Sequence, residues 1–413
     1  MLTTRDIKHR GRRPAARPSS PKSSGPAKEG IGPRFTSSFL PHTSVLVFFV
    51  LFVSFVDQFL CFPVRGAEFL QALHPRDWSF PRDHGRHDGF KTEWWYFTGN
   101  MHDAGGREFG YQLTFFRTAF TAQPTTRASP WAMTDLYFAH AAISDVSGKT
   151  FIFKDRLERG RPRLAWASDN SLDVVLLDWS AQMKDHTIDL RANEPGFKID
   201  LTCGADRGPV LQGPGGVNFK GRQPGQASYY YSVTRLPTAG SLTINDHKYQ
   251  VTGLSWMDHE FSSNSLSAEQ SGWDWMGLQL SDGTDLMIYR LRNKTGTTDY
   301  LSGTRVTPDG KPHYLAAGDI QMIGSHDWTS PQSGGVYPQQ WTVKVAGLPD
   351  LLVTSAMPGQ ELITSASTKV TYFEGVAHVT DLQGHPIGAG YLEMTGYSKS
   401  RDASSRSSST TGT

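Results

Sequence analysis

Short alternating stretches separated by tight-turn sequences recur along this chain and constrain its fold more than any other feature. In residues 109–116 the apolar Phe109, Tyr111, Leu113 and Phe115 take one face of an expected strand, opposite Gly110, Gln112, Thr114 and Phe116. Turn sequences such as Asn-Asp and Asp-Gly stand at residues 146–149, 244–247, 281–284, 308–311 and 382–385. No stretch sustains a helical period. The sequence therefore predicts an all-β protein of antiparallel strands, folded as a β-barrel or β-sandwich.

The length of the chain favours two domains. Of 413 residues, about 350 follow the N-terminal segment, which is enough for two cores. A stretch rich in Gly and Pro at 213–225 precedes a strong strand pattern, so we expect an N-terminal domain over 68–240 and a C-terminal domain over 241–397. Trp-Trp-Tyr-Phe-Thr-Gly at 94–99 and Trp-Asp-Trp-Met-Gly at 273–277 form a loose repeat, which hints at a duplicated module.

Both ends of the chain differ in composition from its middle. Residues 1–43 hold nine Lys or Arg and two Asp or Glu among Pro, Ser and Gly, which predicts a disordered basic leader. Subtracting this +7 from the formal net charge of +2 leaves about −5 for the rest. A mildly acidic folded part makes nucleic acid an unexpected partner. Residues 398–413, rich in Ser and Thr, predict a disordered tail.

An apolar stretch at 44–64 is interrupted only by Asp57 and Gln58 and is long enough to cross a bilayer as one helix. It is either a membrane anchor or a cleaved signal peptide. Because the basic residues precede it, the remainder of the chain is expected on the periplasmic or extracellular side, anchored or secreted. Only Cys61 and Cys203 occur, so no disulfide framework is expected.

Carboxylates stand inside aromatic runs, as in 256–261, where a strand would place Trp256, Asp258 and Glu260 on one face and Met257, His259 and Phe261 on the other. Burial favours the protonated form of a carboxyl group. Asp258 is therefore a candidate general acid, and His259 is a candidate proton carrier near neutral pH. The alternative is that both belong to a buried hydrogen-bond network without chemistry.

Aromatic pairs on shared strand faces are candidate ligand contacts, namely Trp94, Tyr96, Tyr229, Tyr231, Trp256, Trp273 and Trp275. They suit an apolar or isoprenoid-like small molecule, and equally an ordinary core. The phenol of Tyr231 is also a candidate proton donor. Polar residues in apolar strands are expected to support the site by pairing with one another: Glu93, Arg117, His140, Asp274 and Arg290. The second histidine of a zinc helix and the lysine of a phosphate loop are both missing, so neither a metal nor a cofactor is expected.

Several long motifs, in order, resemble the AttH family of tandem lipocalin-like proteins, grouped with the carotenoid 1,2-hydratases or hydroxyneurosporene synthases. These motifs are residues 87–100, 138–141, 227–236, 256–261, 272–275 and 390–397. The resemblance covers about residues 82–397. It implies two lipocalin-like β-barrel or sandwich domains with a ligand site at or between them.

The resemblance also implies a chemistry. In the hydratase branch an aspartate protonates a terminal alkene and water captures the cation, and the matching position here is Asp258. That branch carries Tyr-His where Trp256-Met257 stand, and His and Trp where Tyr229 and Tyr231 stand, which places the chain nearer the AttH side. AttH members often accompany an ABC transporter. Two hypotheses follow: an acid catalyst of the hydro-lyase type on an apolar molecule, and a non-catalytic carrier or transporter accessory.

Overall fold

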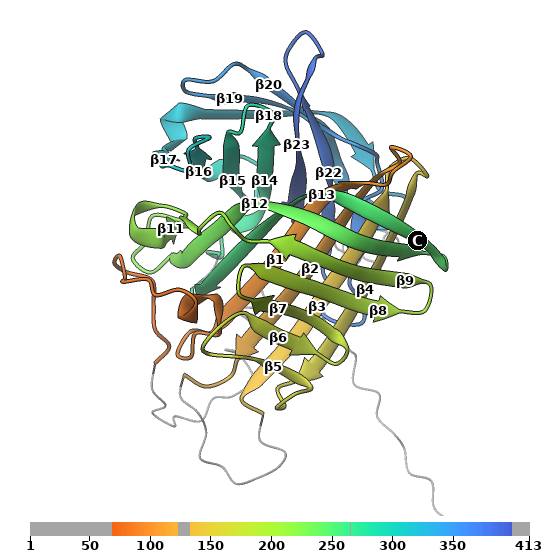
Figure 1. Ribbon diagram of the computed structural model, residues 1–413. Helices are drawn as coiled ribbons and strands as arrows, with labels where there is room; N and C mark the ends of the chain where they lie inside the picture. Colours follow the sequence, from red (N-terminus) through yellow and green to blue (C-terminus); the bar gives the residue numbers. More distant parts are fainter. Residues whose placement is uncertain (1–67, 123–132, 265, 399–413) are drawn as a thin grey trace, which may run out of the picture. The chain divides into compact units, whose positions relative to one another are not determined.

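The computed structural model describes residues 68–122, 133–264 and 266–398, where the strands form two antiparallel sheets. Within these residues the only helices are the short 3-10 helices η1 (Arg82–His84), η2 (Pro214–Gly216) and η3 (Ala317–Asp319). The predicted all-β class is therefore confirmed (Figure 1).

The first sheet contains β1 (Thr92–His102), β2 (Glu108–Ala119), β3 (Asp135–Asp145), β4 (Thr150–Arg159), β5 (Ala165–Ala167), β6 (Asp173–Leu176), β7 (Trp179–Lys184), β8 (Thr187–Glu194), β9 (Phe197–Gly204), β10 (Val210–Leu211), β11 (Val217–Phe219), β12 (Ala227–Ile244) and β13 (His247–Ser262). Its order is β4-β3-β2-β1-β13-β12-β9-β8-β7-β6-β5, and β10 and β11 also pair with β12.

The second sheet contains β14 (Gln270–Leu280), β15 (Asp285–Asn293), β16 (Thr298–Val306), β17 (Pro312–Leu315), β18 (Ile320–Thr329), β19 (Val336–Val345), β20 (Leu351–Ser355), β21 (Glu361–Ile363), β22 (Thr371–Thr380) and β23 (Pro386–Thr395). Its order is β17-β16-β15-β14-β23-β22-β20-β19-β18, and β21 also pairs with β22.

The two sheets repeat one topology. In each, four consecutive strands form a meander, and the first of them also pairs with the last strand of that sheet: β1 with β13, and β14 with β23. The repeated tryptophan sequences at 94–99 and 273–277 lie on these two equivalent first strands. The weak internal repeat of the sequence thus coincides with a repeated strand order.

All five predicted turns join adjacent strands of a hairpin. The turn between β12 and β13 consists of Asn245 and Asp246, whose φ angles of 49° and 66° are the left-handed values that a two-residue type I′ hairpin requires. The other four turns connect β3 to β4, β14 to β15, β16 to β17, and β22 to β23.

The change from the first sheet to the second falls between Ser262 and Gln270, not at residue 240. Gly240 lies inside β12, paired with Leu201 of β9 on one side and Val251 of β13 on the other. Residues 241–262 are therefore required to complete the first sheet, because β13 pairs with β1. The stretch rich in Gly and Pro precedes a strand of the first sheet instead of a new domain.

Each sheet curls around its own apolar core. Phe109, Tyr111, Leu113 and Phe115 lie together in the first core, on the face that their alternation predicts. A second core lies within the second sheet and includes Trp341 and Phe373. A third cluster joins residues of both sheets, among them Tyr96, Tyr230 and Trp275. This contact between sheets positions the site described below.

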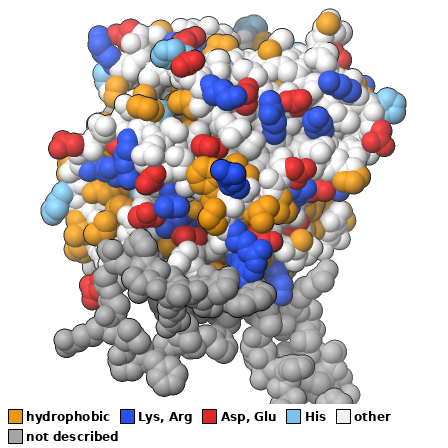
Figure 2. Space-filling view, turned by 60° about the horizontal axis from the view of Figure 1, so that its bottom comes forward, with side chains coloured by type: hydrophobic (Ala, Val, Ile, Leu, Met, Phe, Trp, Pro, Cys, Tyr) orange, Lys and Arg blue, Asp and Glu red, His pale blue; other side chains and the backbone are white. Residues whose placement is uncertain are grey.

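The predicted basic leader, the apolar segment 44–64 and residues 399–413 of the predicted tail lie outside the described residues. Within the described ranges, no helix has the length and apolar character needed to cross a membrane. Figure 2 shows Lys and Arg side chains interspersed with Asp and Glu over one face of the molecule.

Candidate active site

A cavity of about 170 Å³ is lined by side chains of both sheets. We call it the inter-sheet cavity. Trp94 and Tyr96 of β1 line it from the first sheet, and Trp273 and Trp275 of β14 line it from the second. Acidic residues also belong to its lining, among them Asp258, Glu260, Glu374 and Glu393. Acids and aromatic rings thus share one cavity.

Asp258 of β13 belongs to the first-sheet wall of the cavity. On the neighbouring strands it stands opposite Tyr96 of β1 and Ser232 of β12, so the three side chains form one row across the sheet. Its side chain is almost completely buried and accepts three hydrogen bonds: from the Tyr230 hydroxyl (2.5 Å), the Ser232 hydroxyl (2.5 Å) and the Trp256 indole (2.7 Å).

The direction of these hydrogen bonds is fixed by the groups behind them. The Trp275 indole donates to the Tyr230 oxygen at 3.2 Å, and the Gln212 amide donates to the Ser232 oxygen at 2.8 Å. Each hydroxyl therefore accepts from an N–H group and directs its own proton at Asp258. Burial raises the pKa of Asp258 to about 7, and the three donors limit that rise because they stabilise the carboxylate. Both protonation states are thus accessible near neutral pH.

The phenol at the acid is that of Tyr230, whereas the sequence pattern had favoured its neighbours. Tyr231 and His259 point to the opposite face of the first sheet, where the Tyr231 hydroxyl lies 3.1 Å from Nδ1 of His259. Tyr229 donates its hydroxyl proton to the carbonyl of His74 and packs on Phe261. The structure therefore separates these three candidates from Asp258.

The remaining aromatic candidates gather at the cavity. Trp94, Tyr96, Trp273 and Trp275 line it. Trp256 lies just behind the wall, where its ring packs edge-on against Trp275 at 6.1 Å between centroids.

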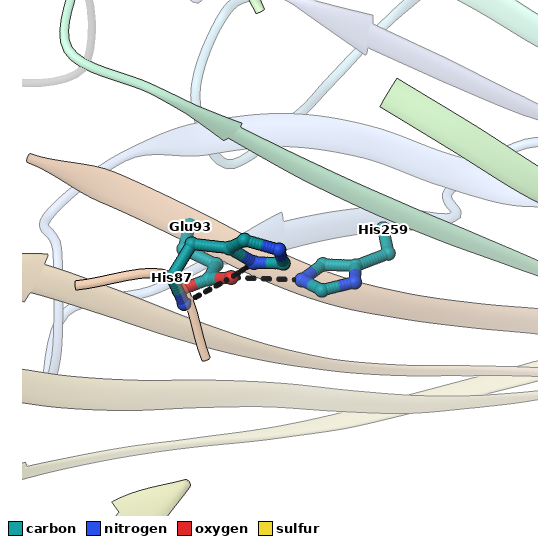
Figure 3. Close-up of side chains that lie close together, drawn as sticks. All are labelled: His87, Glu93 and His259. Carbon is teal, nitrogen blue, oxygen red and sulfur yellow. Dashed lines mark hydrogen bonds and ion pairs between the residues drawn. The ribbon is translucent and has the colours of Figure 1, made fainter. Parts of the chain in front are cut away.

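His259 belongs to a buried hydrogen-bond network on the other side of the sheet. One oxygen of Glu93 lies 2.9 Å from Nε2 of His259 and 2.8 Å from Nδ1 of His87, so it sits between the two rings (Figure 3). Nε2 of His87 lies 3.0 Å from Asp83. Burial alone would raise the pKa of Glu93, but the hydrogen bonds from His259 and His87 hold it well below its usual range.

Every proton in this network has an assignable position. Since Glu93 and Asp83 are carboxylates and only accept, both ring nitrogens of His87 donate, and His87 is an imidazolium stacked on Phe261 at 3.6 Å. His259 donates from Nε2, which leaves Nδ1 to accept from Tyr231. The Tyr231 oxygen in turn accepts from Nδ1 of His84 at 2.7 Å. The network is complete as a structural clamp.

His87, Glu93 and His259 also form a group that brings three metal-ligand atoms within 4.8 Å of one another. Ligands around a tetrahedral zinc ion stand about 2.0–2.1 Å from the metal and are therefore separated by about 3.3 Å. The separations of 2.8 and 2.9 Å from the Glu93 oxygen to the two rings are those of direct hydrogen bonds. The described geometry therefore fits direct hydrogen bonds between these three side chains better than coordination of a metal ion.

The supporting polar residues pair as follows. Arg117 lies 2.7 Å from Asp135 and 3.6 Å from Glu93, and Arg290 lies 2.6 Å from Asp274. His140 does not pair with any of the expected acids. Its Nδ1 lies 2.8 Å from the Tyr372 hydroxyl and its Nε2 lies 3.0 Å from Ser367, and burial lowers the pKa of His140 to about 3. It joins the two sheets as a neutral ring.

The acids that the second sheet contributes to the cavity are not among the residues predicted from the sequence. Glu374 of β22 and Glu393 of β23 are direct cross-strand partners, and Glu393 also stands beside Trp275 of β14. Burial raises the pKa of Glu393 to about 7, with Glu260 and Asp258 adding to the effect. An acid within an apolar strand pattern, the signal that revealed Asp258, is also present in Tyr372-Phe373-Glu374 and Leu392-Glu393-Met394.

Comparisons with known proteins agree with this architecture. The family model of AttH-like proteins matches residues 71–397. A candidate AttH from Nitrosomonas europaea of known crystal structure is 30% identical, with a TM-score of 0.73 over 80% of this chain and 100% of that one. Kievitone hydratase from Nectria haematococca is 15% identical, with a TM-score of 0.60 over 81% of this chain and 97% of that one, and shares the fold.

No curated protein matches the chain by sequence. The family match nevertheless spans both sheets and the whole inter-sheet cavity, and it agrees with the resemblance seen in the sequence motifs. This protein belongs to the AttH-like family.

Proposed function

We propose that this protein binds an apolar small molecule in the inter-sheet cavity and that Asp258 protonates an alkene of that molecule. The observation that carries the proposal is the placement of Asp258: a buried carboxyl group in an aromatic cavity, whose pKa is raised to about 7 by burial. An acid with a pKa near the working pH combines a sizeable protonated fraction with a useful tendency to release the proton.

The surroundings of Asp258 suit the proton transfer that this reaction needs. The acid proton moves to one alkene carbon, the π electrons form the new C–H bond, and the adjacent carbon becomes a cation. Three donors then stabilise the carboxylate left behind. The rings of Tyr96, Trp94 and Trp275 in the cavity wall offer π faces to the cation. Addition of water completes a hydration when the surplus proton of the bound water returns to the Asp258 carboxylate, and transfer of a neighbouring C–H proton to that carboxylate completes an isomerisation.

The name of kievitone hydratase, which shares the fold at 15% identity, supports hydration as the reaction class. The second candidate of the sequence analysis, a carrier without chemistry, uses the same cavity but no proton transfer. Export, the anchor at 44–64 and an ABC transporter partner remain proposals that belong mainly to this candidate.

The test uses a panel of isoprenoid and prenylated aromatic alkenes in water enriched in oxygen-18, with mass spectrometry of the products. Hydration adds one labelled water, and Asp258→Asn should abolish the gain. The substitution should be tolerated, because the asparagine oxygen can still accept from Ser232 and Trp256 while its amide donates to the Tyr230 oxygen. Matched melting temperatures of the two forms provide the control.

Unimpaired turnover in Asp258→Asn would remove Asp258 from the reaction. Binding of the alkenes without any conversion by the wild-type chain would favour the carrier.

A further inference from the structure

Glu374 is the buried group of the inter-sheet cavity that the proposed proton transfer does not use. Its side chain is 0% exposed, and neither of its carboxyl oxygens has a well-aligned hydrogen-bond partner among the described residues. The one nearby donor is the hydroxyl of Tyr96, which opposes the rise in the pKa of Glu374. Other buried carboxyl groups on the described strands of the second sheet, such as Asp274 and Asp285, have hydrogen-bond partners. Glu361, also buried, accepts hydrogen bonds from Ser330, Ser333 and Tyr337. The missing partners of Glu374 are therefore a local feature of the cavity.

The basic side chains that line the cavity are already engaged. The ammonium of Lys220 lies 2.9 Å from Glu260 and over the ring of Tyr289. Arg117 is paired with Asp135 at 2.7 Å. No ion pair to Glu374 occurs within the ranges that the structure covers. Burial raises the pKa of Glu374 well above its usual range, and the neighbouring Glu393 adds to the rise.

A neutral carboxyl group has a specific hydrogen-bonding character. It presents one O–H donor and one carbonyl acceptor, whereas a carboxylate only accepts. Other atoms of the cavity lining also lack a well-aligned hydrogen-bond partner in the described part of the chain, among them the hydroxyl of Tyr96, which lies near Glu374, and the side-chain oxygen of Gln112. Both come from the first sheet. Both walls of the cavity thus carry hydrogen-bonding groups without a well-aligned partner. Buried polar groups in folded proteins rarely lack hydrogen bonds.

We propose that the ligand of this protein is an apolar molecule that carries a hydroxyl group, either an alcohol or a phenol, which hydrogen-bonds to Glu374. A hydroxyl group can donate a hydrogen bond to the carbonyl oxygen of a neutral carboxyl group and accept one from its O–H. The aromatic wall formed by Trp94, Trp273 and Trp275 receives the apolar body. A plain hydrocarbon would leave Glu374 with no partner other than the nearby hydroxyl of Tyr96. This inference rests on the proposed binding of an apolar molecule in the same cavity and specifies its chemical class.

The test compares two probes of nearly equal shape, 4-butylphenol and its methyl ether 4-butylanisole, by quenching of tryptophan fluorescence in the full-length protein. Four of the eleven tryptophans of the chain lie in or behind the cavity wall, so a bound probe should quench their share of the emission. The phenol should bind at least about tenfold more tightly, because the ether cannot donate to Glu374. Glu374→Gln, which keeps a donor and an acceptor, should retain the preference, whereas Glu374→Leu should abolish it.

The matched control is Glu361→Gln, a buried acid of the same sheet outside the cavity, which should keep the wild-type preference. Glu374→Leu should also melt no lower than the wild type, because it removes a buried group without partners. Equal affinity of the wild type for the two probes would overturn the inference and leave the proposed function standing. If neither probe binds and no alkene is converted, the proposed function itself fails.

Discussion

The hydrogen bond from Tyr230 to Asp258 supplies a sharp test of how the acid is tuned. Tyr230→Phe deletes one of three donors to a buried carboxylate while retaining the ring. A hydrogen bond to a charged group contributes about 1.5–3 kcal/mol, and one pKa unit corresponds to about 1.4 kcal/mol. The pKa of Asp258, about 7 in the intact protein, should therefore rise by about 1–2 units in the variant.

The indole of Trp256 reports this titration directly, because its N–H donates to Asp258. In protein with ¹⁵N-labelled tryptophan, the indole cross-peak of Trp256, identified by its loss in Trp256→Phe, should shift with a midpoint near pH 7. In Tyr230→Phe the midpoint should move to about pH 8–9. Activity that depends on the protonated acid should persist to correspondingly higher pH.

Tyr231→Phe is the matched control, since the adjacent phenol points to the other face of the strand and bonds to His259 and His84. It should leave the Trp256 midpoint unchanged. An unchanged or lowered midpoint in Tyr230→Phe, or an equal shift in Tyr231→Phe, would show that the Tyr230 hydroxyl does not stabilise the Asp258 carboxylate.

Three further predictions concern stability. Glu93→Gln should lower the free energy of unfolding in urea by about 3–5 kcal/mol, because it leaves the imidazolium of His87 without one carboxylate; a loss below 1 kcal/mol would contradict the clamp. Gly110→Ala should lower the free energy of unfolding by about 1–3 kcal/mol, measured by calorimetry, because the new Cβ would lie 2.0 Å from a methyl of Val376 in the other sheet. The control Gly208→Ala should leave the stability unchanged, because no atom lies within 4 Å of the new Cβ. Finally, stability should fall between pH 6 and pH 8. The folded chain binds the protons of Asp258 and Glu393 more tightly than the unfolded chain does, so this stabilisation is lost as the pH rises through about 7. Each acid accounts for about 1.4 kcal/mol of the loss, and in a urea series Asp258→Asn should show a fall smaller by that amount.

The strands and turns were predictable because they are encoded locally. Asn245 and Asp246 adopt left-handed φ angles easily, so their hairpin can be predicted from the local sequence alone. The faces of β13 followed from alternation alone, since Asp258 and His259 must point to opposite sides of a strand. The change of sheet was mispredicted because it depends on which strand pairs with β1, a long-range contact between Thr92–His102 and His247–Ser262.

The site was only partly predictable for the same reason. Alternation showed that Tyr230 and Tyr231 face opposite sides, but only the pairing of β12 with β13 shows that Tyr230 shares the face of Asp258. Glu374 and Glu393 carry the same sequence signal as Asp258, an acid within an apolar strand. Their convergence on the cavity of Asp258 depends on the contact of the two sheets, which no local pattern contains.

The connector between Ser262 and Gln270 has an evolutionary consequence. Asp258 lies before it, while Glu374, the residue proposed to hold the ligand hydroxyl, lies after it. Recombination between relatives at this short connector would exchange the second sheet, which carries Glu374, and keep the first sheet, which carries Asp258. New ligand specificities would then arise while the surroundings of Asp258 within the first sheet stay unchanged.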